Sequence, residues 1–304
     1  MSEGPKLLLI DGNNMAHRVF WANQKKNLAY NGSSTGLVYG FVRQLVSLHK
    51  KWPHHFRIVA WDTEGGSARR VAESKVGVEA GVVPEYYKQS RREKEKPPEI
   101  EDMYEQMDVL RDGLAVTNTL QVAMPEVEAD DILYTYARWA ARWAGSAVIV
   151  SSDQDFYQAI GDGVIVYDAM RKETWSEERF EMEFGFAPRL WVEAGAIMGE
   201  VGPSKDNIYG VDGWGPKTTY KYVKEHGGIS GIRAAILAKS KVGKKEQVFL
   251  DSGERLRLAE SLKRMDVVPV PRARMTRKVD PKKVEAFFLK FGFASLLKEA
   301  WRLS

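Results

Sequence analysis

The chain has 304 residues, of which 44% are hydrophobic and 28% are charged, and its net charge is +4. This is the composition of a globular protein with one or two domains, and it argues against a disordered or fibrous chain. There is no cysteine, which excludes disulfides, thiolate catalysis and cysteine-based zinc sites. The sequence also lacks a signal pattern and an apolar run of about 18 residues, so we expect a cytoplasmic protein.

Alternating apolar strands and amphipathic helices predict an α/β fold with a mainly parallel central sheet flanked by helices. Short apolar runs indicate strands at residues 6–10, 56–61, 147–150 and 164–167. Apolar residues at helical spacing indicate helices at residues 35–49, 100–114 and 127–143. Residues 63–83, rich in glycine, alanine and charge, predict a mobile loop.

The character of the sequence changes at about residue 200, where glycine-rich turns and helical patterns replace the strands. We therefore expect a first domain at residues 1–199 and a second, mostly helical region at residues 200–304. Basic runs lie at residues 88–96, 239–245 and 272–283. They are compatible with binding to a phosphate backbone and equally with a solvated, lysine-rich surface.

Acidic residues follow the predicted strands. Asp11 and Asp62 come directly after the first two, and Asp153 and Asp155 come shortly after the third. Because open α/β sheets bind ligands at the carboxyl ends of their strands, we expect these side chains to share one site. Asp168, after the fourth strand, is expected to be an ordinary cap or turn residue.

A further acidic stretch, Glu128, Asp130 and Asp131, opens the helix at residues 127–143. Acids stabilise a helix N-terminus through its dipole, so this stretch taken alone fits helix capping as well as it fits a functional site. At about 100° per residue, Glu128 and Asp131 share one face of the helix, and Asp130 points away from Glu128.

The sequence lacks the motifs of other common catalytic sites, which leaves the carboxylates as candidates. The five histidines are scattered, and there is no zinc motif, Ser-His-Asp pattern or P-loop. Several carboxylates converge only where cations neutralise them, and oxygen ligands without His or Cys favour Mg²⁺ or Mn²⁺. Two such ions would clamp the attacking and leaving oxygens of a phosphodiester.

Closely spaced glycines at Gly210, Gly213 and Gly215 precede another predicted helix, which carries Lys217. Such glycines let the backbone approach a phosphate and present its N–H groups, although an ordinary turn has the same spacing.

In their order along the chain, these motifs resemble the 5′-nuclease superfamily. The resemblance is to its free-standing flap endonuclease and 5′→3′ exonuclease branch of bacteriophages and bacteria, which also forms the nuclease domain of bacterial DNA polymerase I. The stretches that carry it are L-I-D-G-N-N (9–14), W-D (61–62), Y-K-Q-S-R (87–91), V-E-A-D-D (127–131), S-D-Q-D (152–155), M-G-E (198–200) and D-N-I-Y-G-V-D-G-W-G (206–215).

The resemblance implies a PIN-like nuclease fold and a site for two divalent metal ions, Mg²⁺ or Mn²⁺. The metal-binding acids would be Asp11, Asp62, Glu128, Asp130, Asp131, Asp153, Asp155, Glu200 and Asp206. Arg18, Lys88 and Arg91 would act with Asp11 at the scissile phosphate, and Tyr87 would stack on a base. Residues 86–117 would include a helical arch over a single-stranded 5′ end.

The same resemblance implies that Gly210 to Lys217 belong to a helix–three-turn–helix motif, which binds duplex DNA and a K⁺ ion. The sequence departs from the family pattern between Glu200 and Asp206, where glutamate replaces aspartate and the gap is longer. This insert either loops out and returns Asp206 to the site or weakens the second metal site. The longer connection at residues 63–83 also leaves open which of Arg69 and Arg70 faces the substrate.

We therefore expect a metal-dependent, structure-specific 5′-nuclease of replication or repair, monomeric, acting on flaps, branches, ends or RNA primers of DNA. Any polymerase partner would act in trans, and a phage-encoded enzyme would work in the host cytoplasm. Two alternatives are a PIN-type ribonuclease and a DNA-binding protein with impaired catalysis. Trp139, Trp143 and Trp191 are expected to be core residues and not base-stacking platforms.

Overall fold

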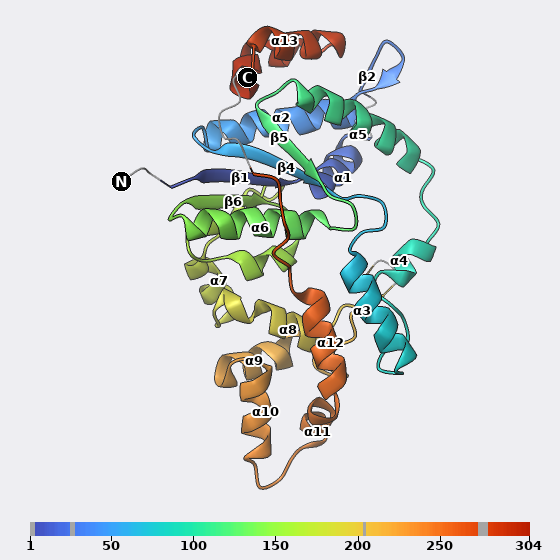
Figure 1. Ribbon diagram of the computed structural model, residues 1–304, viewed down its shortest axis with the longest axis vertical. Helices are drawn as coiled ribbons and strands as arrows, with labels where there is room; N and C mark the ends of the chain where they lie inside the picture. Colours follow the sequence, from blue (N-terminus) through green and yellow to red (C-terminus); the bar gives the residue numbers. More distant parts are fainter. Residues whose placement is uncertain (1–3, 25–27, 203–204, 273–278) are drawn as a thin grey trace.

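The computed structural model of the protein describes residues 4–24, 28–202, 205–272 and 279–304. Its centre is a six-stranded sheet flanked by helices (Figure 1). In spatial order the strands are β5 (Thr119–Ala123), β4 (Phe56–Trp61), β1 (Lys6–Asp11), β6 (Ser146–Val150), β7 (Val164–Asp168) and β8 (Glu173–Trp175). All neighbours are parallel except β8, which runs antiparallel to β7. The predicted mainly parallel α/β sheet is therefore confirmed.

Both faces of this sheet are buried, which explains why β1 is a continuous apolar run. The covering helices are α1 (Gly12–Asn23), α2 (Gly36–Lys51) and α5 (Ile100–Ala115) on one face and α6 (Ala129–Arg142) on the other. Leu8 and Ile10 pack with the first group, whereas Leu7 and Leu9 pack with α6. Because alternate strand residues point to opposite faces, β1 packs against helices on both sides. This packing also fixes the position of its carboxyl end.

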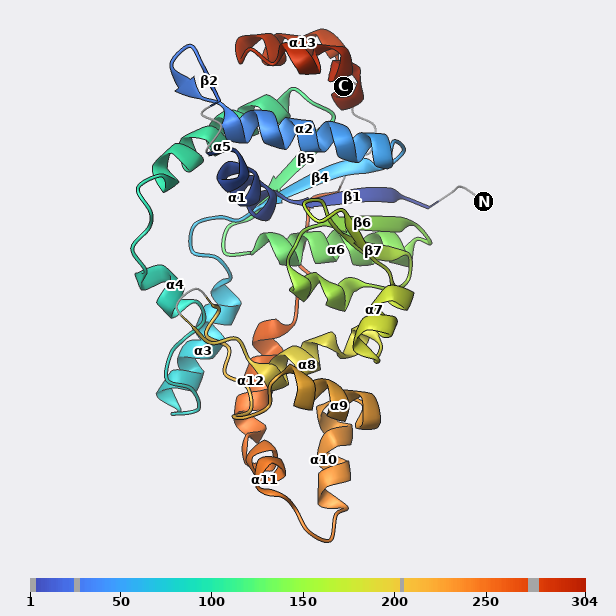
Figure 2. The same cartoon turned by 180° about the vertical axis from the view of Figure 1, so that it is seen from behind.

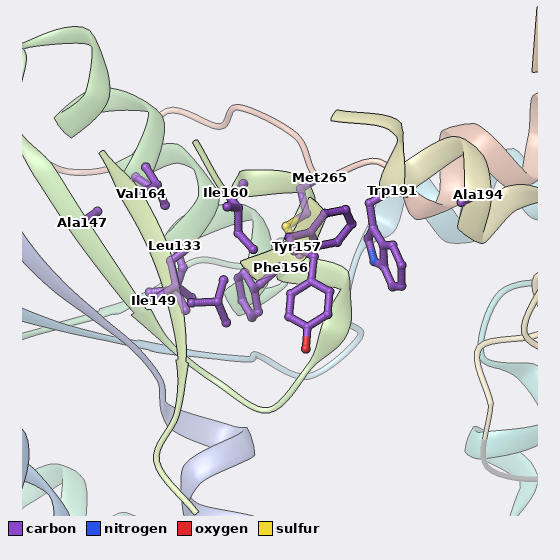
Figure 3. Packing of buried hydrophobic residues seen from close by; sticks show 14 of the residues in the cluster. Leu133, Ala147, Ile149, Phe156, Tyr157, Ile160, Val164, Trp191, Ala194 and Met265 are labelled. Carbon is purple, nitrogen blue, oxygen red and sulfur yellow. The ribbon is translucent and has the colours of Figure 1, made fainter. Parts of the chain in front are cut away.

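Below the sheet in Figure 1 the chain forms a helical region. It contains α7 (Glu177–Phe184), η3 (Pro188–Leu190), α8 (Trp191–Met198), α9 (Pro216–His226), α10 (Ile229–Leu237), α11 (Lys244–Asp251) and α12 (Gly253–Lys263). Figure 3 shows the core running from Ile149 of the sheet through Tyr157 to Trp191 of α8. In the part of the chain that the structure describes, no helix is long and apolar enough to cross a membrane.

The last segments return to the sheet. The helices α13 (Pro281–Lys290) and η4 (Ala294–Leu303) lie beyond α2, at the opposite end of the molecule from α10 and α11 (Figures 1 and 2). Phe288 of α13 is fully buried in the cluster that contains α2. The division at residue 200 stays a prediction, although this return places residues 281–303 beside the first domain.

The predicted loop at residues 63–83 is wrong, because most of it forms helix α3 (Ala68–Glu79). The hydroxyl of Ser67 caps this helix by accepting from the backbone N–H of Arg70. Gly77 of α3 lies so close to Leu258 of α12 that a Cβ there would meet the leucine side chain at 2.5 Å. This helix is stabilised by packing on a distant helix, which local apolar spacing does not reveal.

The prediction that three tryptophans lie in the core is also wrong for two of them. Trp139 and Trp143 of α6 and its C-terminus are 37% and 63% exposed, whereas Trp191 is buried as expected. The sequence pattern also missed β5, β8 and the short hairpin of β2 (Ala29–Tyr30) and β3 (Ser33–Ser34).

Candidate active site

The acids that follow the strands lie at the carboxyl edge of the sheet. In the parallel register Asp11 pairs with Ala60, and Ile10 pairs with Val150. The chain therefore leaves β4 and β6 next to Asp11 and passes directly into the segments that carry Asp62 and Asp153. The common edge predicted from the strand ends is confirmed.

Asp11 is the most enclosed of these acids. Its two carboxylate oxygens accept hydrogen bonds of 3.0 Å from the backbone N–H of Asn14 and from the Ser151 hydroxyl. Burial and the nearby charges of Asp62 and Asp153 raise the pKa of Asp11 to about 7, although these hydrogen bonds act in the other direction. A carboxyl group perturbed in this way by like charges fits a place for a cation.

The carboxylates of Asp62 and Asp153 are exposed, and each accepts a hydrogen bond from a backbone N–H. Asp62 accepts from the N–H of Ala129, at the start of α6, over 2.8 Å. Asp153 accepts from the N–H of Asp155 over 2.9 Å and so caps the short helix η2 (Gln154–Ala159). The first contact ties the end of β4 to the acidic start of α6.

The acids of α6 are held by cations of the protein itself. The Arg70 guanidinium donates to Glu128 and, over 2.8 Å, to Asp131, and it lies 3.4 Å from Asp130. The Lys88 ammonium lies 2.6 Å from the other oxygen of Glu128. Burial would raise the pKa of Glu128, but Lys88 and Arg70 outweigh it and hold this pKa below its ordinary value.

Helix capping does not account for this stretch. Glu128 stands at the N-cap position of α6, yet its side chain makes no capping hydrogen bond and points instead at Arg70 and Lys88. The expected directions on the helix need correction, because Asp130 does not point away from the others. All three carboxylates meet the same guanidinium, since Glu128 precedes the first helical residue and does not follow helical spacing.

A second group of acids is neutralised by Lys263, at the end of α12. Its ammonium lies 3.0 and 3.1 Å from the two oxygens of Asp155 and 2.6 Å from Glu200. Asp206 is held 2.7 Å from the Arg91 guanidinium. Backbone hydrogen bonds in both directions join Glu200 to Ile208, and Asp206 lines the same site; residues 203 and 204 of the insert lie outside the described residues.

These side chains surround a cleft of about 550 Å³. The predicted site residues that line it are Asp11, Arg18, Asp62, Tyr87, Lys88, Arg91, Glu128, Asp130, Asp153, Asp155 and Asp206. Asp131 lies behind the cleft, where it also accepts from the backbone N–H of Asp266 over 2.7 Å. Arg18 lies 3.8 Å from Asp168, which accepts from the N–H groups of Met170 and Arg171 and is a turn residue, as expected.

Two short segments frame the cleft where the arch was predicted. Helix α4 (Gln89–Glu93) and the start of α5 are joined by an extended connection that stands away from the body of the molecule (Figure 1). Lys88 and Arg91 line the cleft from one end of this connection, and Met103 and Tyr104 line it from the other.

The predicted stacking of Tyr87 on a base does not fit this arrangement. Tyr87 is only 3% exposed, and its hydroxyl donates to Glu128 and Asp206 over 3.2 Å each. Its ring is buried, with the Lys88 ammonium 4.8 Å from the ring centroid, and so has no free face to offer a base.

The predicted metal centre divides into two parts. Over the described ranges, no three Asp, Glu or His side chains are spaced to hold a metal ion. In this arrangement Asp11, Asp62 and Asp153 are therefore not close enough together to hold an ion, but their chemistry suits one, because they offer carboxylate oxygens and the charges of Asp62 and Asp153 act on Asp11. Glu128 and Asp131 do not fit one as they stand, because Arg70 already binds one oxygen of each and Lys88 binds the other oxygen of Glu128.

The glycine-rich turn lies outside this cleft, between α8 and α9. Gly210 passes so close to Ile197 and Gly199 that a Cβ at Gly210 would meet the carbonyl oxygen of Ile197 at 2.4 Å. Gly213 has a positive φ of 78°, which glycine adopts without strain. Lys217 is exposed in the first turn of α9. DNA binding by these residues stays a prediction.

Sequence reasoning missed Lys263 altogether and left Arg70 undecided. Arg70 belongs to the wall of the cleft, but it is 2% exposed and enclosed by acids, while Arg69 does not line the cleft and binds Asp266 in an ion pair. Both missed cations come from helices far along the chain from the acids that they touch, and neither belongs to a local motif.

Comparison with known proteins places these features in a family. Residues 6–185 match the family model described as the 5′-3′ exonuclease, N-terminal resolvase-like domain. A thermostable DNA polymerase I of Thermus thermophilus is 29% identical over 97% of this chain, which spans 33% of that polymerase. A 5′-3′ exonuclease of Aquifex aeolicus is 26% identical over 74% of this chain and 71% of its own length.

A solved structure shares the fold. It is that of the bacteriophage T5 D15 flap endonuclease, in a pseudo-enzyme-product complex with DNA and metal ions. The two chains superpose with a TM-score of 0.65 at 22% identity, over 97% of this chain and 96% of the other.

Proposed function

Because the chain belongs to the family of 5′-3′ exonucleases with a resolvase-like N-terminal domain, we propose that it is a structure-specific 5′-nuclease that hydrolyses DNA at 5′ flaps and 5′ ends. The observation that carries this proposal is the cleft in which Asp11, Asp62 and Asp153 face Lys88 and Arg91. Acids for metal ions and cations for a phosphate are the two components that phosphodiester hydrolysis needs.

The acids of the sheet edge, Asp11, Asp62 and Asp153, would hold Mg²⁺ or Mn²⁺, which prefer carboxylate oxygens. When bound, such an ion acts as a Lewis acid on the phosphate and lowers the pKa of water. Arg18, Lys88 and Arg91 would orient the scissile phosphate and neutralise its charge. Lys88 contacts Glu128 over 2.6 Å, so the phosphate would compete with that carboxylate for its ammonium group.

The segment between Lys88 and Tyr104 would pass over a single-stranded 5′ end, since both ends of it line the cleft. Selection of the substrate would rest on shape and on contacts to the phosphate backbone, because this segment offers basic side chains and no base-reading motif. RNA primers joined to DNA, a polymerase acting in trans and a monomeric enzyme are parts of the same proposal.

One cleavage experiment tests the proposed function. The protein is incubated with a 5′-flap DNA, a blunt duplex and a single-stranded RNA, each with Mg²⁺ or with EDTA. We expect Mg²⁺-dependent cutting of the flap DNA and none in EDTA. Cutting of RNA alone would support a PIN-type ribonuclease, and binding of flap DNA without any cutting would support a protein with impaired catalysis.

The glycine-rich turn and α9 would bind the duplex part of the substrate, and backbone carbonyls of the turn would hold the implied K⁺ ion. We expect Lys217→Ala to weaken duplex binding and to flatten its dependence on salt by about 0.9 in the slope of log K against log [salt], the value for one lost phosphate contact. Binding measured at several salt concentrations checks this. The matched control is Lys298→Ala, an exposed lysine of η4, which should leave the slope unchanged.

A further inference from the structure

Arg70 is an arginine enclosed among acids. Its side chain is 2% exposed. One terminal nitrogen donates to Glu128 and lies 3.4 Å from Asp130, and the other donates to Asp131 over 2.8 Å. One guanidinium thus touches all three carboxylates of the acidic start of α6, which is the place where a metal ion would otherwise bind them.

The position of Arg70 is fixed by elements on two sides. Its backbone is held by the Ser67 cap of α3, and a terminal nitrogen also donates to the carbonyl oxygen of Arg264, after α12, over 3.2 Å. The backbone N–H of Asp266, two residues further on, donates to the same oxygen of Asp131 that Arg70 binds. The contact is therefore built into the packing of α3 against α12 and is not made by a side chain resting on a surface.

The guanidinium also satisfies the oxygens that a metal ion would need. Glu128 has one oxygen on Arg70 and the other on Lys88, while the Asp131 oxygen that meets Arg70 has a backbone donor as well. Removing one partner of such a buried ion pair leaves an uncompensated charge, which is far more costly than losing an exposed pair. By contrast, the carboxylates of Asp11 and Asp62 accept from the backbone N–H groups of Asn14 and Ala129 and from the Ser151 hydroxyl.

We propose that Arg70 is a positioning residue that neutralises Glu128, Asp130 and Asp131 from within, so that the DNA-free protein offers a divalent ion only the part of the site formed by Asp11, Asp62 and Asp153. The inference rests on the proposed metal-dependent nuclease function. It assigns to an internal guanidinium the charge that a metal ion would supply at the start of α6. The number of divalent ions that the protein binds then depends on this arginine.

The test is Mn²⁺ binding to the full chain without DNA, measured by calorimetry and by the loss of the free-ion EPR signal. We expect wild type to bind one ion and Arg70→Met to bind two, because the methionine removes the guanidinium from Asp130 and Asp131 and frees the Glu128 oxygen that Lys88 does not hold. Arg70→Lys, which keeps the charge, should stay at one ion. The matched control is Arg69→Met, the neighbouring arginine of α3 that pairs with Asp266, and it should also stay at one.

Thermal unfolding provides a readout that does not depend on activity. Arg70→Met should melt below wild type in EDTA, and Mn²⁺ at a hundredfold excess over its Kd should raise its Tm by about 5 to 10 °C more than that of wild type. If the variant does not fold in EDTA, the same inference requires that it refolds with Mn²⁺ and not with NaCl of equal ionic strength.

Failure of the role proposed for Arg70 can be distinguished from failure of the proposed nuclease function. Equal stoichiometry and equal Mn²⁺-dependent Tm shifts in wild type and Arg70→Met would overturn the role of Arg70, as would a wild type that cuts flap DNA and binds two ions without DNA. A wild type that neither binds Mn²⁺ nor cuts any DNA would instead overturn the proposed nuclease function.

Discussion

Replacement of Asp11 with asparagine is expected to lower the rate of flap cleavage by more than about a hundredfold. Loss of a residue that only hydrogen-bonds to a metal ligand costs up to about a hundredfold, and Asp11 is proposed to be a ligand itself. Asp11 lies at the carboxyl end of the central strand, between Asp62 and Asp153, and burial together with these neighbours raises its pKa. Asparagine keeps the size of the side chain and can still cap α1, so the fold should persist while the charge is lost. Single-turnover cleavage of a 5′-flap DNA checks the expectation.

Asp112→Asn is the matched control, because this aspartate is exposed on α5 and should leave the rate unchanged. A rate for Asp11→Asn within a few-fold of wild type would remove Asp11 from the catalytic machinery. Circular dichroism and thermal melting of the two variants would show whether a lost rate reflects lost charge or lost structure.

The raised pKa of Asp11 adds a pH dependence with a definite sign. A metal ion needs the ionised carboxylate, so protons compete with it, and Mn²⁺ affinity should weaken as the pH falls through about 7. In the metal-free protein the stabilising state is the protonated one. This contribution to stability is fully present below the ordinary pKa of 3.8 and is lost as the pH rises from there through about 7.

Replacement of Trp214 with alanine is expected to destabilise the helical region by about 3–5 kcal/mol, the usual cost of removing a buried tryptophan. Trp214 is 1% exposed and packs against Tyr222 of α9 and Phe249 of α11, with ring centroids 4.7 Å apart in both pairs. Its indole N–H donates to the carbonyl oxygen of Lys245 over 3.0 Å. Because this side chain joins the glycine-rich turn to α9 and α11, duplex binding should weaken as well.

Urea unfolding measures the stability change, and binding to a blunt duplex measures the functional one. The control is Trp143→Ala, a tryptophan that is 63% exposed and should change stability by no more than about 0.5 kcal/mol. Similar losses for the two variants would show that Trp214 does not have the structural role assigned to it.

The sequence alone predicted much of the fold and the line of acids. The strands at residues 6–10 and 56–61 were recognisable because both faces of a parallel sheet are buried and its strands are continuously apolar. That Asp11, Asp62 and Asp153 would meet followed from the parallel arrangement alone, since it brings the carboxyl ends of all strands to one edge. These inferences needed no knowledge of side-chain contacts.

Helix α3 shows where this kind of inference stops. Few apolar residues at helical spacing mark residues 68–79, and the helix is held by its contact with Leu258 of α12. Tyr87 is a residue of a sequence motif whose role could not be inferred from the local sequence either. Its neighbours in the sequence suggested a role on the substrate, but its hydroxyl binds Glu128 and Asp206, and its ring is buried.

The charge balance of the site was decided only by the tertiary structure. Arg70 stands 58 positions before Glu128, and Lys263 stands 63 positions after Glu200. Periodicity and spacing report on neighbours within a helix or a strand, whereas these ion pairs depend on how α3 and α12 pack beside α6 and α8. The sequence therefore determined which carboxylates share the sheet edge. The packing of distant helices decided which of them are already neutralised by the protein and which remain for a metal ion.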